Sequence, residues 1–193
     1  MVRSVPFYLS EDDPPAKQSI LTSALALFAS RGIDGVSIRD IAADSGFTNP
    51  AMFKYYTSKD DLAFALFEAC YRRLVGPLIA PGTTLRSALA GALDLIETSP
   101  ESVHFVLENL RRYFRDLPES LRSRSLLASM RRFIGAEQKA GRVRGDVDPQ
   151  LAAALVLGML AQIARMAHFD ELSRPASTLV DEVYTLLERG IGG

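Results

Sequence analysis

The sequence has 193 residues, 48% of them hydrophobic, which is enough to bury a substantial core and excludes disorder over most of the chain. Its single cysteine, Cys70, excludes an intramolecular disulfide, and one cysteine with two histidines gives no zinc-ligand spacing. The net charge of −1 excludes a general attraction to nucleic acid, so any DNA site must be local.

The N-terminal residues 1–15 are predicted to form a loosely ordered arm. Acidic and proline residues at positions 11–15 follow without an apolar stretch long enough for a signal peptide. The single cysteine suits a reducing cytoplasm, so a cytoplasmic location is expected. From Ala16 to Arg31, apolar residues recur at helical spacing, and Gly32 follows as a typical C-terminal glycine. This segment predicts a first amphipathic helix.

The next stretch, from Ser37 to Lys59, has the spacing of a helix-turn-helix. Ser37 is an N-cap with an acidic residue three positions later, and Gly46 supplies the turn. The second short helix begins at Thr48 or Asn49, with the following proline at the first helical position.

The polar residues of this stretch favour a phosphate partner. Between Ser45 and Lys59 there is no Asp or Glu, while hydroxyl, amide and lysine donors are frequent. Ser58 is predicted to cap the next helix, which places the Lys59 cation in a first turn where the helix dipole disfavours it. A phosphate at that helix end would satisfy both the lysine and the exposed amides.

The remaining chain reads as further helices, and no alternating apolar pattern predicts a sheet. The predicted helices run from about 58 to 75, 84 to 96, 99 to 114, 118 to 141, 149 to 168 and 175 to 190. The prediction is therefore an all-α protein of about nine helices. We divide it into a helix-turn-helix DNA-binding domain at 16–60 and a helical effector-binding and dimerisation domain at 61–193.

The segment from Leu151 to His168 is apolar on almost all sides and rich in alanine, so it must be covered on most sides. We predict that the helices at 149–168 and 175–190 form a four-helix homodimer interface. The alternative is that 149–168 is the central core helix of a monomer. Its longest apolar run, Leu151 to Ala161, is about half a membrane span, so no membrane partner is expected.

A set of aromatic and methionine side chains in the second half is predicted to bind a small, largely apolar effector, although each is individually more typical of plain core. The candidates are Phe105, Leu110, Tyr113, Phe114, Met130, Phe133, Met159 and Met166.

Residues 17 to 68 resemble the DNA-binding domain of the TetR family of bacterial transcriptional repressors. The resemblance rests on ILTSALALFASRG, VSIRDIAADSG and FTNPAMFKYYTSKDDL, and the later AGRVRGDVDPQLAAALVLGML is also similar to that family. It implies an all-helical homodimer that represses from a palindromic operator on double-stranded DNA and is released when an effector binds.

The resemblance assigns DNA contacts residue by residue. The positions matching phosphate contacts are Thr48, Tyr55 and Lys59, with Ser37 and Arg39 as further candidates. The candidates for base edges are Asn49, Ala51 and Lys54, because Asn can read adenine, Lys can read guanine and a small apolar group can meet the thymine methyl.

Three further positions bear on the recognition helix. Phe53 stands where many family members have a tyrosine that reaches a phosphate, and its ring is predicted to be core. Tyr56 is also predicted to be core. Pro50 stiffens the start of the helix and removes an amide donor.

Two rival classes remain. For an enzyme, the sequence offers no catalytic motif, because it has no Gly-rich phosphate loop, nucleophile elbow or His-Glu-x-x-His motif. Neither catalytic residues, metal nor cofactor are expected. The other rival is a helical small-molecule carrier or interaction protein without DNA binding. A regulator should bind a fragment of its own upstream DNA in a mobility-shift assay, with an affinity that falls as salt rises, whereas a carrier should not.

Overall fold

The computed structural model describes Leu9 and residues 13–191, so most of the predicted 1–15 arm lies outside the described residues. Within them the chain forms ten α-helices and three short 3-10 helices, with no β-strand, which confirms the all-α prediction. The chain divides into two compact units. Unit 1 consists of the chain up to Arg73 together with residues 101–116. Unit 2 consists of residues 74–100 and the chain from Leu117 onward.

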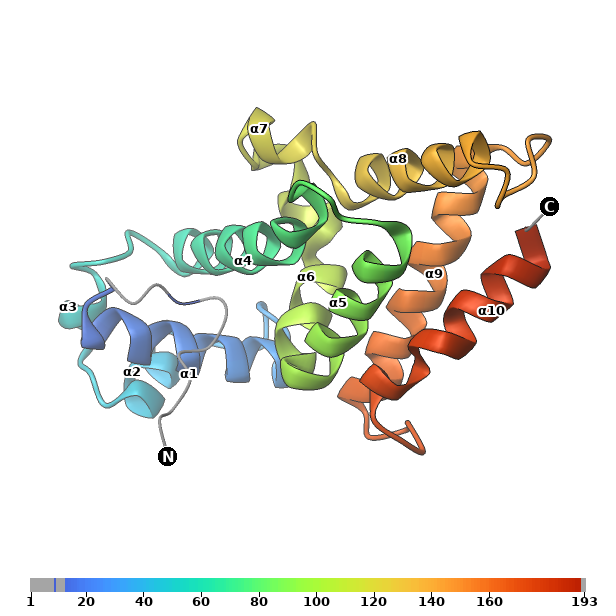
Figure 1. Ribbon diagram of the computed structural model, residues 1–193. Coiled ribbons are helices and arrows are strands. Elements are labelled where there is room, and N and C mark those ends of the chain that lie inside the picture. The colour runs from blue at the N-terminus through green and yellow to red at the C-terminus, as the bar shows by residue number, and fades with distance from the viewer. Residues whose placement is uncertain (1–8, 10–12, 192–193) are drawn as a thin grey trace. The chain divides into compact units, whose positions relative to one another are not determined.

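Unit 1 contains the helix-turn-helix (Figure 1). Its helices are α1 (Pro15–Arg31), α2 (Ile38–Ser45), α3 (Asn49–Met52), most of α4 (Lys59–Val75), α6 (Pro100–Tyr113) and the 3-10 helix η2 (Phe114–Asp116). The apolar face of α1 is buried, and Phe28 stacks on Phe105 of α6 with ring centroids 6.0 Å apart. On α4, the buried Phe67 ring lies 5.5 Å from the Tyr113 ring, so α6 contributes to the same core as the N-terminal helices.

Unit 2 is built around α5, which contacts α8, α9 and α10. Its elements are η1 (Pro77–Ile79), α5 (Leu85–Thr98), α7 (Glu119–Arg122), α8 (Leu126–Lys139), α9 (Pro149–His168), η3 (Ala176–Leu179) and α10 (Val180–Ile191). The predicted cap of α9 is present, because the Asp148 carboxylate accepts hydrogen bonds from the amides of Gln150 and Leu151 at 2.6 and 3.1 Å. These caps fix where α9 begins.

The single helix predicted from 118 to 141 is two helices, α7 and α8. Ser125 is the N-cap at which α8 begins, because its hydroxyl accepts a hydrogen bond from the Ala128 amide at 3.2 Å. Serine competes with helix continuation in this way because its side chain bonds nearby backbone groups. The last predicted helix likewise begins as the 3-10 helix η3 before α10.

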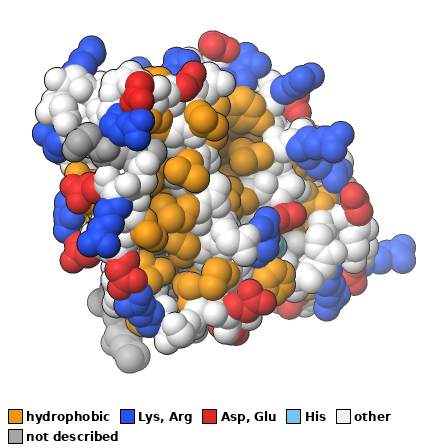
Figure 2. All heavy atoms as spheres, turned by 90° about the vertical axis from the view of Figure 1, so that its right-hand side faces the viewer, with side chains coloured by type: hydrophobic (Ala, Val, Ile, Leu, Met, Phe, Trp, Pro, Cys, Tyr) orange, Lys and Arg blue, Asp and Glu red, His pale blue; other side chains and the backbone are white. Residues whose placement is uncertain are grey.

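One face of α9 is apolar and uncovered. Leu151 and Leu155 are 70% and 56% exposed, and Leu186 of α10 is 63% exposed. Figure 2 views the side on which α9 and α10 lie, and hydrophobic side chains gather across that face. The opposite side of α9, including Ala153 and Val156, is buried, and α8 and α5 pack against this helix.

By length and composition alone, α9 also passes the test for a membrane-spanning helix, with a mean hydropathy of 1.5 over its best window. That window is 28% buried. A single such helix indicates little about a membrane, because packed helices of soluble proteins pass the same test.

Candidate DNA-binding site

The first helix of the motif, α2, begins with a complete capping box. The Ser37 hydroxyl accepts a hydrogen bond from the Asp40 amide at 3.2 Å, and the Ser37 amide donates to the Asp40 carboxylate at 2.8 Å. The same hydroxyl also donates to that carboxylate at 2.7 Å, which lowers the pKa of Asp40. Ser37 therefore already has internal partners, and its predicted phosphate contact stays a prediction.

A tight turn joins α2 to α3. Gly46 has φ +76°, and its amide bonds back to the Ala42 carbonyl, as expected for a left-handed C-cap. Thr48 takes the N-cap position in an extended conformation and Pro50 occupies the first turn of α3. Of the two caps predicted for this helix, the structure has Thr48. Its exposed side chain makes no capping hydrogen bond, so it faces outward at a helix start.

The recognition helix α3 has only four residues, and its side chains and those of the turn after it divide sharply between core and solvent. Met52 and Tyr56, four residues apart, are buried, which confirms the core prediction for Tyr56. Phe53 is 53% exposed, so its predicted core position is wrong. The reason is geometric: once Met52 and Tyr56 point inward, the residue next to Met52 is turned about 100° away around the helix.

The remaining recognition residues are accessible to different degrees. Lys54, Tyr55 and Arg39 are exposed, whereas Asn49 and Ala51 are half-buried. The acid-free stretch from 45 to 59 thus presents an amine, hydroxyls and aromatic groups at the surface of unit 1. Groups of this kind position a protein on DNA phosphates.

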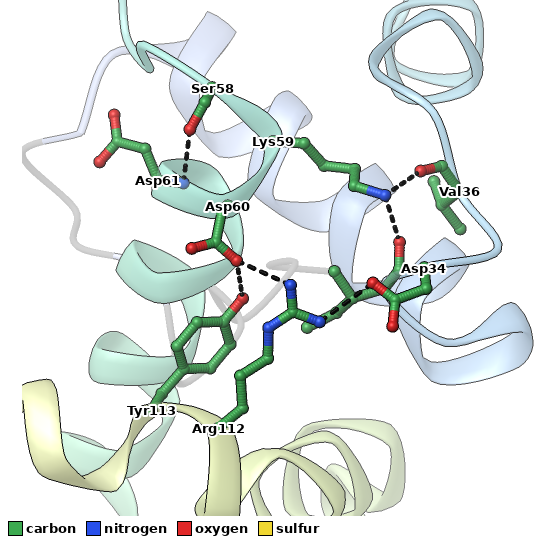
Figure 3. Close-up of polar contacts among 9 residues, drawn as sticks. Asp34, Val36, Ser58, Lys59, Asp60, Asp61, Arg112 and Tyr113 are labelled. Carbon is green, nitrogen blue, oxygen red and sulfur yellow. Dashed lines mark hydrogen bonds and ion pairs between the residues drawn. The ribbon is translucent and has the colours of Figure 1, made fainter.

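Lys59, the first residue of α4, has a partner that the sequence did not reveal. Its ammonium donates to the Ile33 carbonyl at 2.7 Å and to the Val36 carbonyl at 2.8 Å, both in the α1–α2 loop (Figure 3). Ser58 caps α4 as predicted, accepting a hydrogen bond from the Asp61 amide at 3.1 Å. The unfavourable cation at the helix start is therefore compensated within the protein. An ammonium has three N–H donors, and the predicted phosphate contact of Lys59 stays a prediction.

The adjacent Asp60 belongs to a polar cluster with Arg112 and Tyr113 of α6 and with Asp34 (Figure 3). We call these four residues the α6 clasp. The Asp60 carboxylate accepts from the Arg112 guanidinium at 3.0 Å and from the Tyr113 hydroxyl at 2.8 Å. Arg112 also donates to Asp34, in the α1–α2 loop, at 3.0 Å. Burial, followed by the bond to Asp60, raises the pKa of Tyr113.

Sequence reasoning missed the clasp, because its members are separated by 52 to 78 residues. The only signal was a basic residue beside a tyrosine at the end of one helix and an acidic pair at the start of another. The clasp joins the α1–α2 loop and the start of α4 to one end of α6.

The predicted effector residues are divided between the units. Phe105, Leu110, Tyr113 and Phe114 belong to unit 1, and Met130, Phe133, Met159 and Met166 belong to unit 2. Within unit 1, Phe105 stacks on Phe28, and the Phe114 ring lies 6.0 Å from that of Tyr71. Phe105 and Tyr113 are buried in the core of unit 1, whereas Leu110 and Phe114 are half-buried. The contact of all four with a ligand stays a prediction.

The described residues include no cluster of three or more His, Cys, Asp or Glu side chains that could hold a metal. Cys70 is buried, and burial raises the pKa of its thiol to about 12. A thiol in that state is a poor nucleophile at neutral pH.

Comparison with known proteins identifies relatives among bacterial transcriptional regulators. Residues 20–66 match the family described as bacterial regulatory proteins, tetR family. The chain is 31% identical to MftR of Mycobacterium tuberculosis, named as a mycofactocin biosynthesis transcriptional regulator, over 70% of this chain and 71% of that protein. It is 27% identical to the HTH-type transcriptional repressor Rv1474c of Mycobacterium tuberculosis, over 89% of this chain and 93% of that protein.

Two solved structures share the fold. The ketosteroid transcriptional regulator KstR2 of Mycobacterium tuberculosis has a TM-score of 0.77 at 16% identity, covering 95% of this chain and 98% of that one. The fatty acid degradation regulator FadR of Bacillus halodurans has a TM-score of 0.71 at 18% identity, covering 93% and 98%. At these identities the likeness concerns the fold alone.

Proposed function

This chain belongs to the TetR family of bacterial transcriptional regulators, and on that premise we propose that it is a cytoplasmic repressor. It binds a palindromic operator as a homodimer and is released by a small, largely apolar effector. The observation that carries the DNA-binding part is the acid-free stretch from 45 to 59, which exposes Thr48, Lys54 and Tyr55 in a helix-turn-helix whose first helix begins with a complete capping box.

Each part of that stretch has a proposed role. Thr48, Tyr55 and Lys59 hold phosphates, with Ser37 and Arg39 at the start of α2. Lys54, Asn49 and Ala51 meet base edges in the major groove. The exposure of Lys54 and Tyr55 supports the assignment most directly, because both side chains reach solvent from the turn that directly follows α3.

The homodimer is supported by the uncovered face of unit 2. Exposed leucines on α9 and α10 leave an apolar surface that a second copy would cover in an isologous contact through residues 149–168 and 175–190. Their exposure argues against the alternative that α9 is the central core helix of a monomer. A dimer also sets two recognition helices about 34 Å apart, one turn of DNA.

The effector class is supported by the apolar character of the candidate residues. Met130 and Phe133 of α8 are buried apolar side chains, and methionine adapts its shape to apolar guests. Two proteins with this fold are named for ketosteroids and for fatty acid degradation. We propose a mainly apolar effector on this basis, with no membrane involved.

The test selects bound sites from a pool of genomic fragments and measures affinity by electrophoretic mobility shift. Lys54→Ala should weaken binding about tenfold or more and reduce the salt dependence, since the variant loses a cation at the DNA surface. Tyr55→Phe removes only a hydroxyl and should weaken binding less. The control is Lys139→Ala, which removes an exposed lysine on α8 and should leave affinity unchanged.

Failure would take a definite form. If the pure dimer selects no fragment at low salt, the repressor proposal is wrong and a ligand carrier becomes the better description. Equal losses for Lys54→Ala and Lys139→Ala would refute the assigned recognition surface while leaving non-specific DNA binding intact.

A further inference from the structure

Phe53 is an exposed aromatic side chain, and none of the described residues forms a ring contact or cation–π contact with it. Among the large hydrophobic side chains that the structure describes in unit 1, Phe53 and Tyr55 are the exposed ones, at 53% and 39%. The others with comparable exposure lie in unit 2. A single exposed hydrophobic residue is ordinary, but these two occur within three positions of the recognition stretch.

The backbone fixes where Phe53 lies. Its φ and ψ of −68° and −5° continue the turn of α3, and its amide donates to the Asn49 carbonyl at 3.2 Å. Residues three apart share one side of a helix, so Phe53, the C-cap of α3, lies on the side of Pro50, which is also exposed. Lys54 follows in the next turn and is exposed as well. Met52 and Tyr56 take the buried side. The ring therefore belongs to the outward surface that carries Lys54.

The chemistry of the ring narrows its partner on DNA. A phenyl group neither donates nor accepts a conventional hydrogen bond, so it adds little beside a hydrated phosphate. The floor of the major groove offers one markedly apolar group, the C5-methyl of thymine, and phenylalanine is among the side chains that contact it.

We propose that Phe53 contacts a thymine methyl group in each operator half-site and is a specificity-determining residue. The proposal rests on the proposed function, because it requires α3 to enter the major groove. It replaces the core position that the sequence predicts for this ring.

The experiment compares wild type with Phe53→Ala on the selected operator and on versions in which one thymine per half-site is replaced by uracil. Uracil differs from thymine only by the missing methyl. At one thymine, uracil should weaken wild-type binding about fourfold per half-site, the value of one apolar carbon removed from water. Phe53→Ala should bind the thymine operator at least about fourfold more weakly per half-site and should be indifferent to that uracil.

A matched variant separates the contact from folding. Phe53→Tyr keeps the ring and should keep the uracil penalty, and thermal unfolding of all variants should match wild type because the side chain is half exposed. The proposal is overturned if no uracil position weakens wild type, or if Phe53→Ala retains the full penalty at every thymine. Either result leaves the repressor function standing when wild type still selects its operator. If wild type selects no DNA, both proposals fail.

Discussion

A charged substitution on the apolar face of α9 and α10 should dissociate the proposed homodimer. Leu155 is 56% exposed in one chain, so somewhat more than half of its burial energy is still to be gained. Full burial of a leucine side chain contributes about 1.5–3 kcal/mol, which leaves about 1–2 kcal/mol per copy and about 2–4 kcal/mol per symmetric dimer. Leu155→Glu should therefore raise the dimer dissociation constant by about 30- to 700-fold, before the cost of burying charge is added.

Sedimentation equilibrium over a range of protein concentrations measures that constant, with circular dichroism to confirm that the helices remain. The matched control is Leu127→Glu, which changes an exposed leucine on α8 outside α9 and α10. The reasoning is refuted if Leu155→Glu stays dimeric at the wild-type dissociation constant. It is refuted equally if Leu127→Glu dissociates the protein to the same extent.

Three smaller changes test the recognition unit. Lys59→Met should weaken DNA binding and also destabilise the fold by about 1–3 kcal/mol, because two loop carbonyls lose their donor. Lys54→Met should weaken DNA binding alone, and thermal unfolding distinguishes the two variants. Ser37→Ala should raise the pKa of Asp40 toward its ordinary 3.8 in an NMR titration. Because the folded-state pKa is depressed, the stability that Asp40 contributes is present above that ordinary value and is lost as pH falls through the folded-state pKa; the variant should show less of this loss. Tyr56→Phe should stabilise by up to about 1 kcal/mol in chemical denaturation, since the buried hydroxyl has no hydrogen-bond partner within the described structure; clear destabilisation would contradict this.

Most of the helices, and the starts of α2 and α9, could be predicted because they depend on local signals. The spacing of apolar residues predicted α1 and α9, and the caps at Ser37 and Asp148 are present with the expected hydrogen bonds. Each signal lies within about one helical turn of the feature that it determines.

The direction of Phe53 could not be predicted, because a four-residue helix contains too little periodicity to separate one face from the other. The partners of Lys59 were equally hidden, since its carbonyl acceptors lie 23 and 26 residues earlier. The misfit of a lysine at a helix start was a correct observation, but the fold offers an internal compensation for it as well as a possible phosphate.

The α6 clasp shows why the recognition stretch depends on residues outside the predicted 16–60 domain. Its ion pairs join exposed groups, with Arg112 41% and Asp34 87% exposed, and such pairs contribute about 0–1 kcal/mol each. These pairs therefore matter less for stability than for orienting the start of α4. Asp60 accepts hydrogen bonds from two donors of α6, while its neighbour Lys59 donates to the α1–α2 loop. Both constraints act on the first two residues of α4, where the acid-free stretch ends. The end of that stretch is thus held by two sets of contacts, from the α1–α2 loop to Lys59 and from α6 to Asp60. The α6 residue that contacts Asp60 lies about fifty residues further along the chain.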